Sequence, residues 1–288
     1  MNRPMNRAAS QAWRFVRALW DAFERFNLND GWPMAGFIAF SGLLSIFPFL
    51  IFAATLTGMI VGEARSAQII DALFNIAPEH VARTLEPVIV EVLAKQSGGI
   101  LTLSAVFAIY VASNAVEAFR IAFDRAYAVA DPRGIIQNRI LAIFIVFVGA
   151  IVAALLGLLI IFSPLFMLMA ESFANRRIPL VSGYMTYGFG ILVFSGFVLL
   201  MHLTLPGRSI ALKRLWPGVL VSTAVWLAAA GGFTYYLRYT PTYTVTYGTL
   251  AGVIITLMFF YLTGATIIYG AEVNAALHRL SPPSKTRR

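Results

Sequence analysis

Residues 247–275 read YGTLAGVIITLMFFYLTGATIIYGAEVNA, and this stretch decides the fold class. Glu272 is its only charged residue. A helix that crosses a bilayer needs about 20 mostly apolar residues, because each residue adds about 1.5 Å across a hydrocarbon core of about 30 Å. The stretch is long enough to span that core and carries almost no charge. It therefore predicts a transmembrane helix.

Five more stretches of the chain share this character. Together they give six predicted spans, at 34–62, 99–122, 139–170, 179–205, 212–237 and 247–275. The composition agrees, since 59% of the 288 residues are hydrophobic and only 12% are charged. A soluble domain carries about 25% charged residues, and so little charge would leave very large apolar patches in water. We therefore predict an all-α integral membrane bundle of about six transmembrane helices.

The positions of the Lys and Arg residues predict the orientation of this bundle, because cytoplasmic connections are enriched in them. With the N-terminus inside, 16 of the 22 basic residues fall in the cytoplasmic segments 1–30, 120–139, 205–214 and 279–288. The net charge of +9 therefore fits an orientation signal better than a groove for nucleic acid. Both termini are expected in the cytoplasm.

Residues 1–30 precede the membrane domain, which we place at 31–278. In this segment Trp13, Val16, Trp20, Phe23 and Phe26 share one helical stripe. The pattern is typical of an amphipathic helix that lies in the cytoplasmic interface of the membrane. A helix packed on the cytoplasmic ends of the bundle would show the same pattern, so both interpretations stay open.

Two other segments lie outside the spans. The outside connection between the first two spans, 64–98, has apolar residues at helical spacing and is expected to be helical, with capping of the bundle as its simplest role. The end of the chain, 279–288, is a short basic tail expected in the cytoplasm.

Polar side chains near the span ends are the candidate functional residues, because lipid makes unpaired polar groups costly. In the second span, helical spacing places four of them near one face: Asn114, Glu117, Arg120 and Asp124. In the sixth span, Glu272 and Asn274 are expected at a similar depth. We hypothesise that these helix ends meet in one charged cluster, with Arg120 or Arg125 bridging carboxylates. Such a cluster would be an ion-paired clamp that fixes helix register, or a site for a coupling ion or a proton.

A second candidate region lies in the first span, which contains Ser41, Ser45 and Pro48. A proline in the middle of a span removes one backbone hydrogen bond and displaces a carbonyl group, so a kink is predicted there. Many transporters build binding sites from broken helices, although a kink that serves packing alone is commoner. Tyr243 and Tyr247 near the last outside turn belong to an interfacial aromatic belt or line a cavity.

The sequence contains no pattern typical of catalysis. His80, His202 and His278 lie in different segments without metal-ligand spacing, and the chain has no cysteine. It also has no glycine loop that would cradle a phosphate and no nucleophile elbow. We therefore predict no catalytic, cofactor-binding or metal site, no cofactor and no nucleic-acid partner.

Three passages of the chain resemble the YihY/BrkB family of bacterial inner-membrane proteins, once labelled ribonuclease BN. They are AFSGLLSIFPFLIF at 39–52, ASNAVEAFRIAFDRAY at 112–127 and YTVTYGTLAGVIITLMFFYLTGATIIYGAEVNAAL at 243–277. The last passage is the most specific. Leu205-Pro206-Gly207 and Trp216-Pro217-Gly218 also look like the family's connection between the fourth and fifth spans.

The resemblance implies a six-span protein of the bacterial inner membrane, an association with serum resistance for some members, and a transport role. It also implies that the ribonuclease label is a misassignment for this fold. Family members often carry a long hydrophilic C-terminal tail, whereas LSPPSKTRR is all that follows Arg279 here.

Two functions remain in competition at this point. The first is a transporter or envelope-maintenance protein for a small solute or a lipid, favoured by the mid-span proline, the charged residues and the family resemblance. The second is a scaffold without transport activity that assembles with other envelope proteins or with copies of itself. In both cases the lipid bilayer is the surrounding partner. A polar cavity that reaches Ser45, Asn114 or Tyr247 would favour transport.

Overall fold

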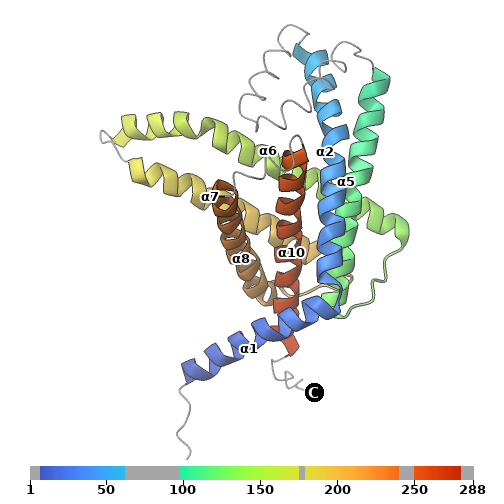
Figure 1. Cartoon of the computed structure of the whole chain (residues 1–288), viewed down its shortest axis with the longest axis vertical. Coiled ribbons are helices and arrows are strands. Elements are labelled where there is room, and N and C mark those ends of the chain that lie inside the picture. Colours follow the sequence, from blue (N-terminus) through green and yellow to red (C-terminus); the bar gives the residue numbers. More distant parts are fainter. Residues whose placement is uncertain (1–6, 62–97, 175–178, 240–249, 280–288) are drawn as a thin grey trace, which may run out of the picture. The chain divides into compact units, whose positions relative to one another are not determined.

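The computed structural model describes residues 7–61, 98–174, 179–239 and 250–279. This part of the chain forms seven helices and contains no strand (Figure 1). The helices are α1 (Arg7–Leu28), α2 (Gly31–Val61), α5 (Gly98–Tyr127), α6 (Ile135–Ala174), α7 (Pro179–Thr204), α8 (Leu212–Tyr239) and α10 (Ala251–Arg279). The predicted all-α fold class is confirmed. The expected outside segment 64–98 and the tail after Arg279 lie outside the described residues.

Each predicted span overlaps one long helix, in chain order α2, α5, α6, α7, α8 and α10. Within the described ranges, five helical stretches are long and apolar enough to cross a membrane: Gly31–Phe49, Gly99–Tyr127, Ile135–Ala153, Leu212–Tyr239 and Ala251–Arg279. In α7 the corresponding apolar stretch, Gly188–Thr204, is shorter. Some helices run further than their apolar residues predicted. The second span was expected to end at 122, but α5 continues to Tyr127 because an Arg120–Asp124 pair, four residues apart, supports its last turns.

A tight turn joins α1 to α2. The backbone N–H of Asn29 donates to the carbonyl of Arg25 at 2.8 Å, and Asp30 takes a left-handed conformation with a φ of 60°. Asp is one of the few residues that tolerate this conformation. The next residue, Gly31, lies against the Phe26 ring, since a Cβ there would be 2.5 Å from a ring carbon. The turn thereby holds Asn29 in a defined position.

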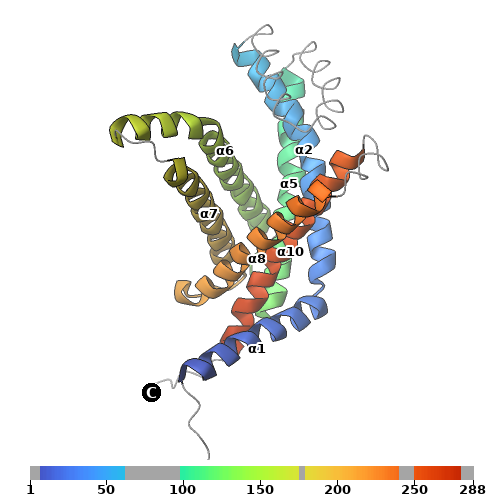
Figure 2. The same ribbon diagram turned by 60° about the vertical axis from the view of Figure 1, so that its left-hand side comes forward.

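The helices divide into two compact units. Unit 1 contains residues 1–31, 120–225 and 266–288, and unit 2 contains residues 32–119 and 226–265. In unit 1, α6 and α7 lie side by side, as both Figure 1 and Figure 2 show. Gly149 of α6 makes room for α7, because a Cβ added there would lie 3.3 Å from the Phe197 ring. A small residue at this position lets the two helices approach each other closely.

The C-terminal half of α10 supplies much of the core of unit 1. Nearly every residue from 265 to 276 is buried. Val273 and Ala276 pack against Ala18 and Ala22 of α1. A helix that is apolar on nearly all sides is a core helix, and small side chains let its neighbours approach closely. Any polar group on this half of α10 is therefore held away from both water and lipid.

Unit 2 is built around contacts between α2 and the first half of α10. A Cβ added to Gly264 would lie 3.4 Å from the Ala35 backbone. The Trp32 ring stacks on the Tyr261 ring with centroids 6.1 Å apart. On α8, the indole N–H of Trp226 donates to the Thr263 hydroxyl at 3.0 Å. Small residues, aromatic rings and one buried polar pair thus hold these helices together.

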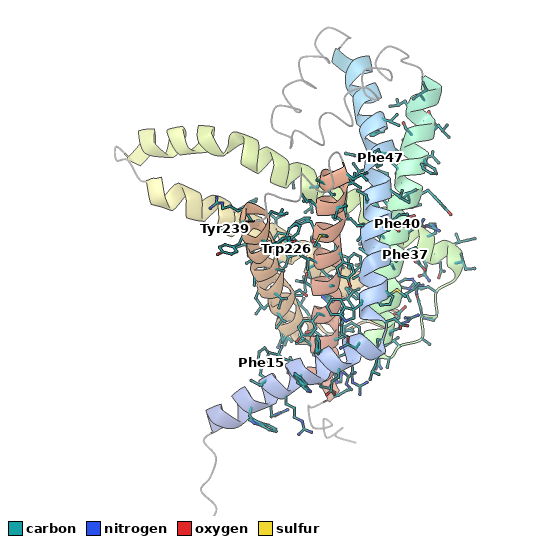
Figure 3. All side chains as sticks on the ribbon, in the orientation of Figure 1. Phe15, Phe37, Phe40, Phe47, Trp226 and Tyr239 are labelled. Atoms are coloured by element: carbon teal, nitrogen blue, oxygen red, sulfur yellow. The ribbon has the colours of Figure 1, made fainter. Side chains whose placement is uncertain are left out.

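The outward face of α2 is apolar. Phe37, Phe40, Leu44 and Phe47 follow one another at helical spacing and are all exposed, and Figure 3 shows the three phenylalanines along this helix. A row of exposed aromatic and aliphatic side chains is a large apolar patch, which a protein in water rarely presents. Hydrocarbon is the surrounding that suits this face.

Candidate functional site

Two polar side chains lie in the buried half of α10. Glu272 is 0% exposed and Asn274 is also buried. Two residues apart on a helix, they point about 200° from each other. They therefore meet different neighbours, and together with Asn29, Tyr127 and Gly218 we name them the α10 polar site.

Glu272 faces the turn after α1. The side-chain amide of Asn29 donates to Oε1 of Glu272 at 2.6 Å. The other oxygen, Oε2, is buried and has no hydrogen-bond partner among the described residues. A carboxyl group with one neutral partner and one empty acceptor position is expensive to bury in its charged form. It is therefore well suited to accept a proton or a small cation.

Charged groups surround Glu272 without pairing with it. Arg25 and Asp21 of α1 and Arg279 of α10 act on it through their charges. However, Arg25 and Arg279 both pair with Asp21, at 3.5 Å and 3.3 Å. Within the described part of the chain, neither arginine forms an ion pair with Glu272. The positive groups nearby are thus already engaged by another carboxylate.

Asn274 faces α8 and the end of α5. Its side-chain oxygen accepts a hydrogen bond from the Gly218 backbone N–H at 2.6 Å, and its amide nitrogen donates to the Leu215 carbonyl at 3.0 Å. The same nitrogen lies 3.4 Å from the Tyr127 hydroxyl. One side chain therefore joins α10 to the first turns of α8 and to the last residue of α5.

Two glycines allow α8 and α10 to cross closely enough for these bonds. A Cβ added to Gly218 would lie 2.2 Å from the Gly270 carbonyl oxygen, and one added to Gly270 would lie 1.8 Å from the Ser222 hydroxyl. Real side chains do not fit at such distances. The motifs Trp216-Pro217-Gly218 and Gly270-Ala271-Glu272-Val273-Asn274 are thus two halves of one helix crossing.

His202 extends the polar site towards α7. It is fully buried, its ring stacks on Phe123 with centroids 4.5 Å apart, and its Nδ1 lies 3.4 Å from the Tyr127 hydroxyl. Its Nε2 has no partner among the residues that the structure describes. Among its described residues, unit 1 therefore contains two buried protonatable side chains, Glu272 and His202, and each has one polar atom without a partner there.

A second group of polar side chains lies at the end of α5. The Arg120 guanidinium pairs with Asp124 at 2.9 Å and with Asp131 at 2.7 Å. Asp131 also accepts hydrogen bonds from the side chain and the backbone N–H of Arg133, at 2.8 Å and 3.0 Å. We name these four residues the arginine–aspartate cluster. Its two positive and two negative charges balance.

The arginine–aspartate cluster also binds the connection between α7 and α8. Arg133 donates to the carbonyls of Thr204 and Leu205, and the Gly207 backbone N–H donates to Asp124 at 2.7 Å. Gly207 is required here, because a Cβ would lie 2.6 Å from Cα of Asp131. Burial alone would raise the pKa of Asp131, but the bonds from Arg133 and its charge outweigh that effect and lower the pKa to about 2. The cluster thus links the end of α5 and the turn that follows it to the connection between α7 and α8, which is distant in sequence.

An open cavity of about 460 Å³ lies beside the cluster. It is lined by Arg120, Ile121, Asp124, Arg125 and residues 128–131. Its arginines already have carboxylate partners, since Arg125 pairs with Asp30 at 2.8 Å. The charges that line this cavity therefore stabilise the protein's own turns.

The structure brings some predicted site residues together and separates others. Arg120 and Asp124 form an ion pair, whereas Glu272 bonds to Asn29 and Asn274 bonds to Gly218. Asn114 and Glu117 lie on the part of α5 that belongs to unit 2. A single cluster of all six residues therefore remains a prediction.

The residues of the predicted kink lie on α2, which is helical through Pro48. Ser41 is buried, and the Ser45 hydroxyl donates to the Gly42 carbonyl at 2.7 Å. The other two candidates for a cavity wall, Tyr243 and Tyr247, lie outside the described residues. The cavity expected beside these side chains stays a prediction.

Sequence reasoning missed Asn29, Tyr127, Asp131, Arg133 and His202 as site residues. Two signals were present: His202 is a polar residue inside an apolar run, and Asp131 stands between Arg125 and Arg133. Asn29 gave no signal, because its partner is 243 residues away in sequence.

Both sites lie within a region that matches known proteins. A family described as Virulence factor BrkB matches residues 22–288. The chain belongs to the BrkB family. The resemblance found in the three sequence passages is thereby confirmed. The protein is an integral membrane protein of a bacterial family, with several apolar helices.

Individual relatives of this BrkB family chain are distant, and the matches with them cover most of this chain. A ribonuclease-like protein named YfkH from Bacillus subtilis is 28% identical over 265 residues, which cover 90% of this chain and 94% of YfkH. A UPF0761 membrane protein from Pseudoalteromonas translucida is 26% identical over 257 residues, which cover 84% of this chain and 80% of that protein. Another UPF0761 membrane protein, from Azoarcus, is 24% identical over 256 residues, which cover 88% of this chain and 62% of that protein. No solved structure matches the chain.

Proposed function

We propose that this BrkB family protein is a transporter of the bacterial inner membrane that crosses the bilayer six times, with both termini in the cytoplasm. It moves a small solute or a lipid, and the α10 polar site binds the proton or small cation that drives the movement. Glu272 is the residue that accepts this ion.

The burial of Glu272 carries the proposal. An ionisable group inside a membrane helix is rare, costly and usually functional. Glu272 is 0% exposed and has one amide partner, and its second oxygen has no partner among the residues that the structure describes. A residue selected only to join helices would be expected to use both oxygens, as Asp131 does with Arg120 and Arg133. Ion binding is the role that needs an acceptor left open.

The distribution of basic residues supports the proposed topology. The segments that carry 16 of the 22 Lys and Arg residues all fall on one side if six helices cross the membrane. Reporter fusions after Arg133 and Arg214 test this directly. Both reporters should be active on the cytoplasmic side, and a result with the two on opposite sides would overturn the six-span topology.

Transport is tested in proteoliposomes that contain the purified protein and the pH-sensitive dye pyranine. A panel of amino acids, organic acids, sugars and metal cations is added outside, and transfer of a fluorescent phospholipid between leaflets is followed in parallel. One class should give transport that depends on an imposed pH or cation gradient. Glu272→Gln should abolish the gradient dependence, whereas Glu24→Gln, the same change on an exposed carboxylate of α1, should preserve it.

Two results would contradict the proposal. If Glu272→Gln transported like the unmodified protein with the same gradient dependence, Glu272 would not be the ion site. If no class moved although the protein was folded, the scaffold function would be favoured, and cross-linking in cells should then capture envelope proteins or a second copy. The proposal includes no ribonuclease activity, because that chemistry needs metal ligands or an acid–base pair in water, and the sequence has no pattern for either.

A further inference from the structure

Helix α1 has one face that is fixed against the rest of unit 1. Ala18 and Ala22 are fully buried against Val273 and Ala276 of α10. The Tyr269 hydroxyl donates to the carbonyl of Leu19 at 3.0 Å. These contacts determine which side of α1 faces outward. They also place the helix beside the end of a span, where a bilayer surface must be near.

The outward side of α1 is aromatic. Trp13 is 62% exposed and Trp20 is 65% exposed, with Val16 between them and Phe23 one turn further on. Phe15, labelled in Figure 3, is exposed on the same helix. The predicted apolar stripe thus divides: Phe26 is buried, while its other four residues face away from the protein. The face requires an apolar cover.

The N-terminal part of α1, residues 7–20, is basic. From Arg7 to Trp20, α1 contains three arginines and no carboxylate, and its first acidic residue is Asp21. The guanidinium of Arg17 lies over the Trp13 ring, 5.7 Å from its centroid. The two acidic residues further along already have partners, since Asp21 pairs with Arg279 and Glu24 accepts from Trp20. Residues 7–20 are therefore basic in sequence, and the carboxylates of α1 begin only at Asp21.

We propose that this face binds anionic phospholipids, with Trp13 and Trp20 at the level of the glycerol backbone and Arg14 and Arg17 on the lipid phosphates. Tryptophan rings prefer this depth of a bilayer, and arginines beside an apolar face favour anionic lipids over zwitterionic ones. A bilayer is already adjacent to the span on which α1 packs, so no further partner has to be recruited. The site selects lipid by charge, which goes beyond an interfacial position.

Brominated lipids test this proposal, because bromine on an acyl chain quenches nearby tryptophans. The full-length protein is placed in vesicles of phosphatidylglycerol and phosphatidylcholine in equal amounts, with either one or the other lipid brominated. The signal of Trp13 and Trp20 is the difference between the unmodified protein and Trp13→Phe/Trp20→Phe. This signal should be quenched about twofold more by brominated phosphatidylglycerol, and the preference should weaken in high salt.

The matched variants are Arg14→Gln/Arg17→Gln and, as a control, Arg238→Gln, which removes an exposed arginine from the far end of α8. The double variant should lose the preference while quenching by phosphatidylcholine continues, and the control should keep it. Equal quenching by both lipids in the unmodified protein would overturn the proposal. The absence of quenching at Trp13 and Trp20 would also overturn it and would indicate that a protein covers this face.

Discussion

The arginine–aspartate cluster and the α10 polar site both place polar groups near helix ends in unit 1, but they differ in charge balance. In the cluster, two arginines meet two aspartates, and both aspartates also bind backbone N–H groups. In the α10 polar site, Glu272 has one neutral partner, and its other oxygen is unpaired within the described part of the chain. Every carboxylate of the first group is bonded several times, whereas the second group contains an oxygen without a partner among the described residues.

Under the proposed function, this difference distinguishes ion pairs that stabilise the fold from a carboxyl group that binds an ion. A saturated ion pair resists change, because removal of any member leaves an uncompensated charge. An open carboxyl can gain or lose an ion while its surroundings stay in place. We therefore expect substitutions in the first group to affect stability, and substitutions of Glu272 to affect transport.

The largest expected effect comes from the crossing that holds the α10 polar site. Gly218→Ala would place a Cβ against the Gly270 carbonyl, where backbone must move. We expect the free energy of unfolding to fall by about 3–4 kcal/mol. The measurement is the unfolding midpoint in mixed dodecylmaltoside and SDS micelles.

Gly231→Ala is the matched control on the same helix, because no atom of the described residues lies within 4 Å of the position of its Cβ. That change should be neutral or slightly stabilising. Equal midpoints for the two variants would show that α8 and α10 do not cross closely at Gly218.

The second prediction breaks the saturated cluster. Arg120→Leu leaves Asp124 and Asp131 without their shared cation, and its side chain is only 13% exposed. We expect a loss of about 2–3 kcal/mol, somewhat less than for a fully buried pair. The neighbouring Arg125→Leu removes an ion pair whose arginine is 40% exposed, so a loss below about 1 kcal/mol is expected. If both variants were equally stable, the cluster would not be a structural link.

These two predictions also show what the sequence could reveal. The helices were predictable because hydrocarbon requires long apolar runs, and each of the six runs became a helix. The Arg120–Asp124 pair was predictable because its members lie four residues apart on one helix. Local spacing and the solvent thus determine much of the fold.

The rest of the site depends on contacts between distant segments. The position of Gly218 against Asn274 follows from how two helices cross, which no periodicity specifies. The bond from Asn29 to Glu272 likewise needs the turn at Asp30 and the packing of α1 on α10. Sequence analysis identified Glu272 from its chemistry but could not identify its partner.

The third prediction uses acid to weaken the cluster. The pKa of Asp131 is lowered to about 2 by Arg133, below the value of about 3.9 in an unfolded chain. The ionised Asp131 therefore stabilises the fold fully above about pH 4, and this contribution disappears as the pH falls through about 2. Arg120, Arg133 and Asp124 are the charged groups that face it.

The comparison with Asp131→Asn isolates this effect. At pH 7 the variant should be less stable by about 1.5 kcal/mol, because it loses hydrogen bonds to charged groups. The difference should shrink steadily between about pH 4 and pH 2. A difference that stayed constant over this range would mean that the charge of Asp131 does not stabilise the fold.

The smallest effect on stability is expected at Glu272, and this prediction tests the comparison most directly. In Glu272→Gln the amide oxygen can still accept the bond from Asn29, while the ionisable group is gone. The free energy of unfolding should therefore change by less than about 1 kcal/mol. Glu272→Leu removes the acceptor as well and should cost about 1–2 kcal/mol, because the Asn29 amide then loses its partner. If Glu272→Gln destabilised the protein as much as Arg120→Leu, the carboxylate would be a structural charge like those of the arginine–aspartate cluster. A stable Glu272→Gln that has lost gradient-driven transport is the result that only an ion-binding carboxyl explains.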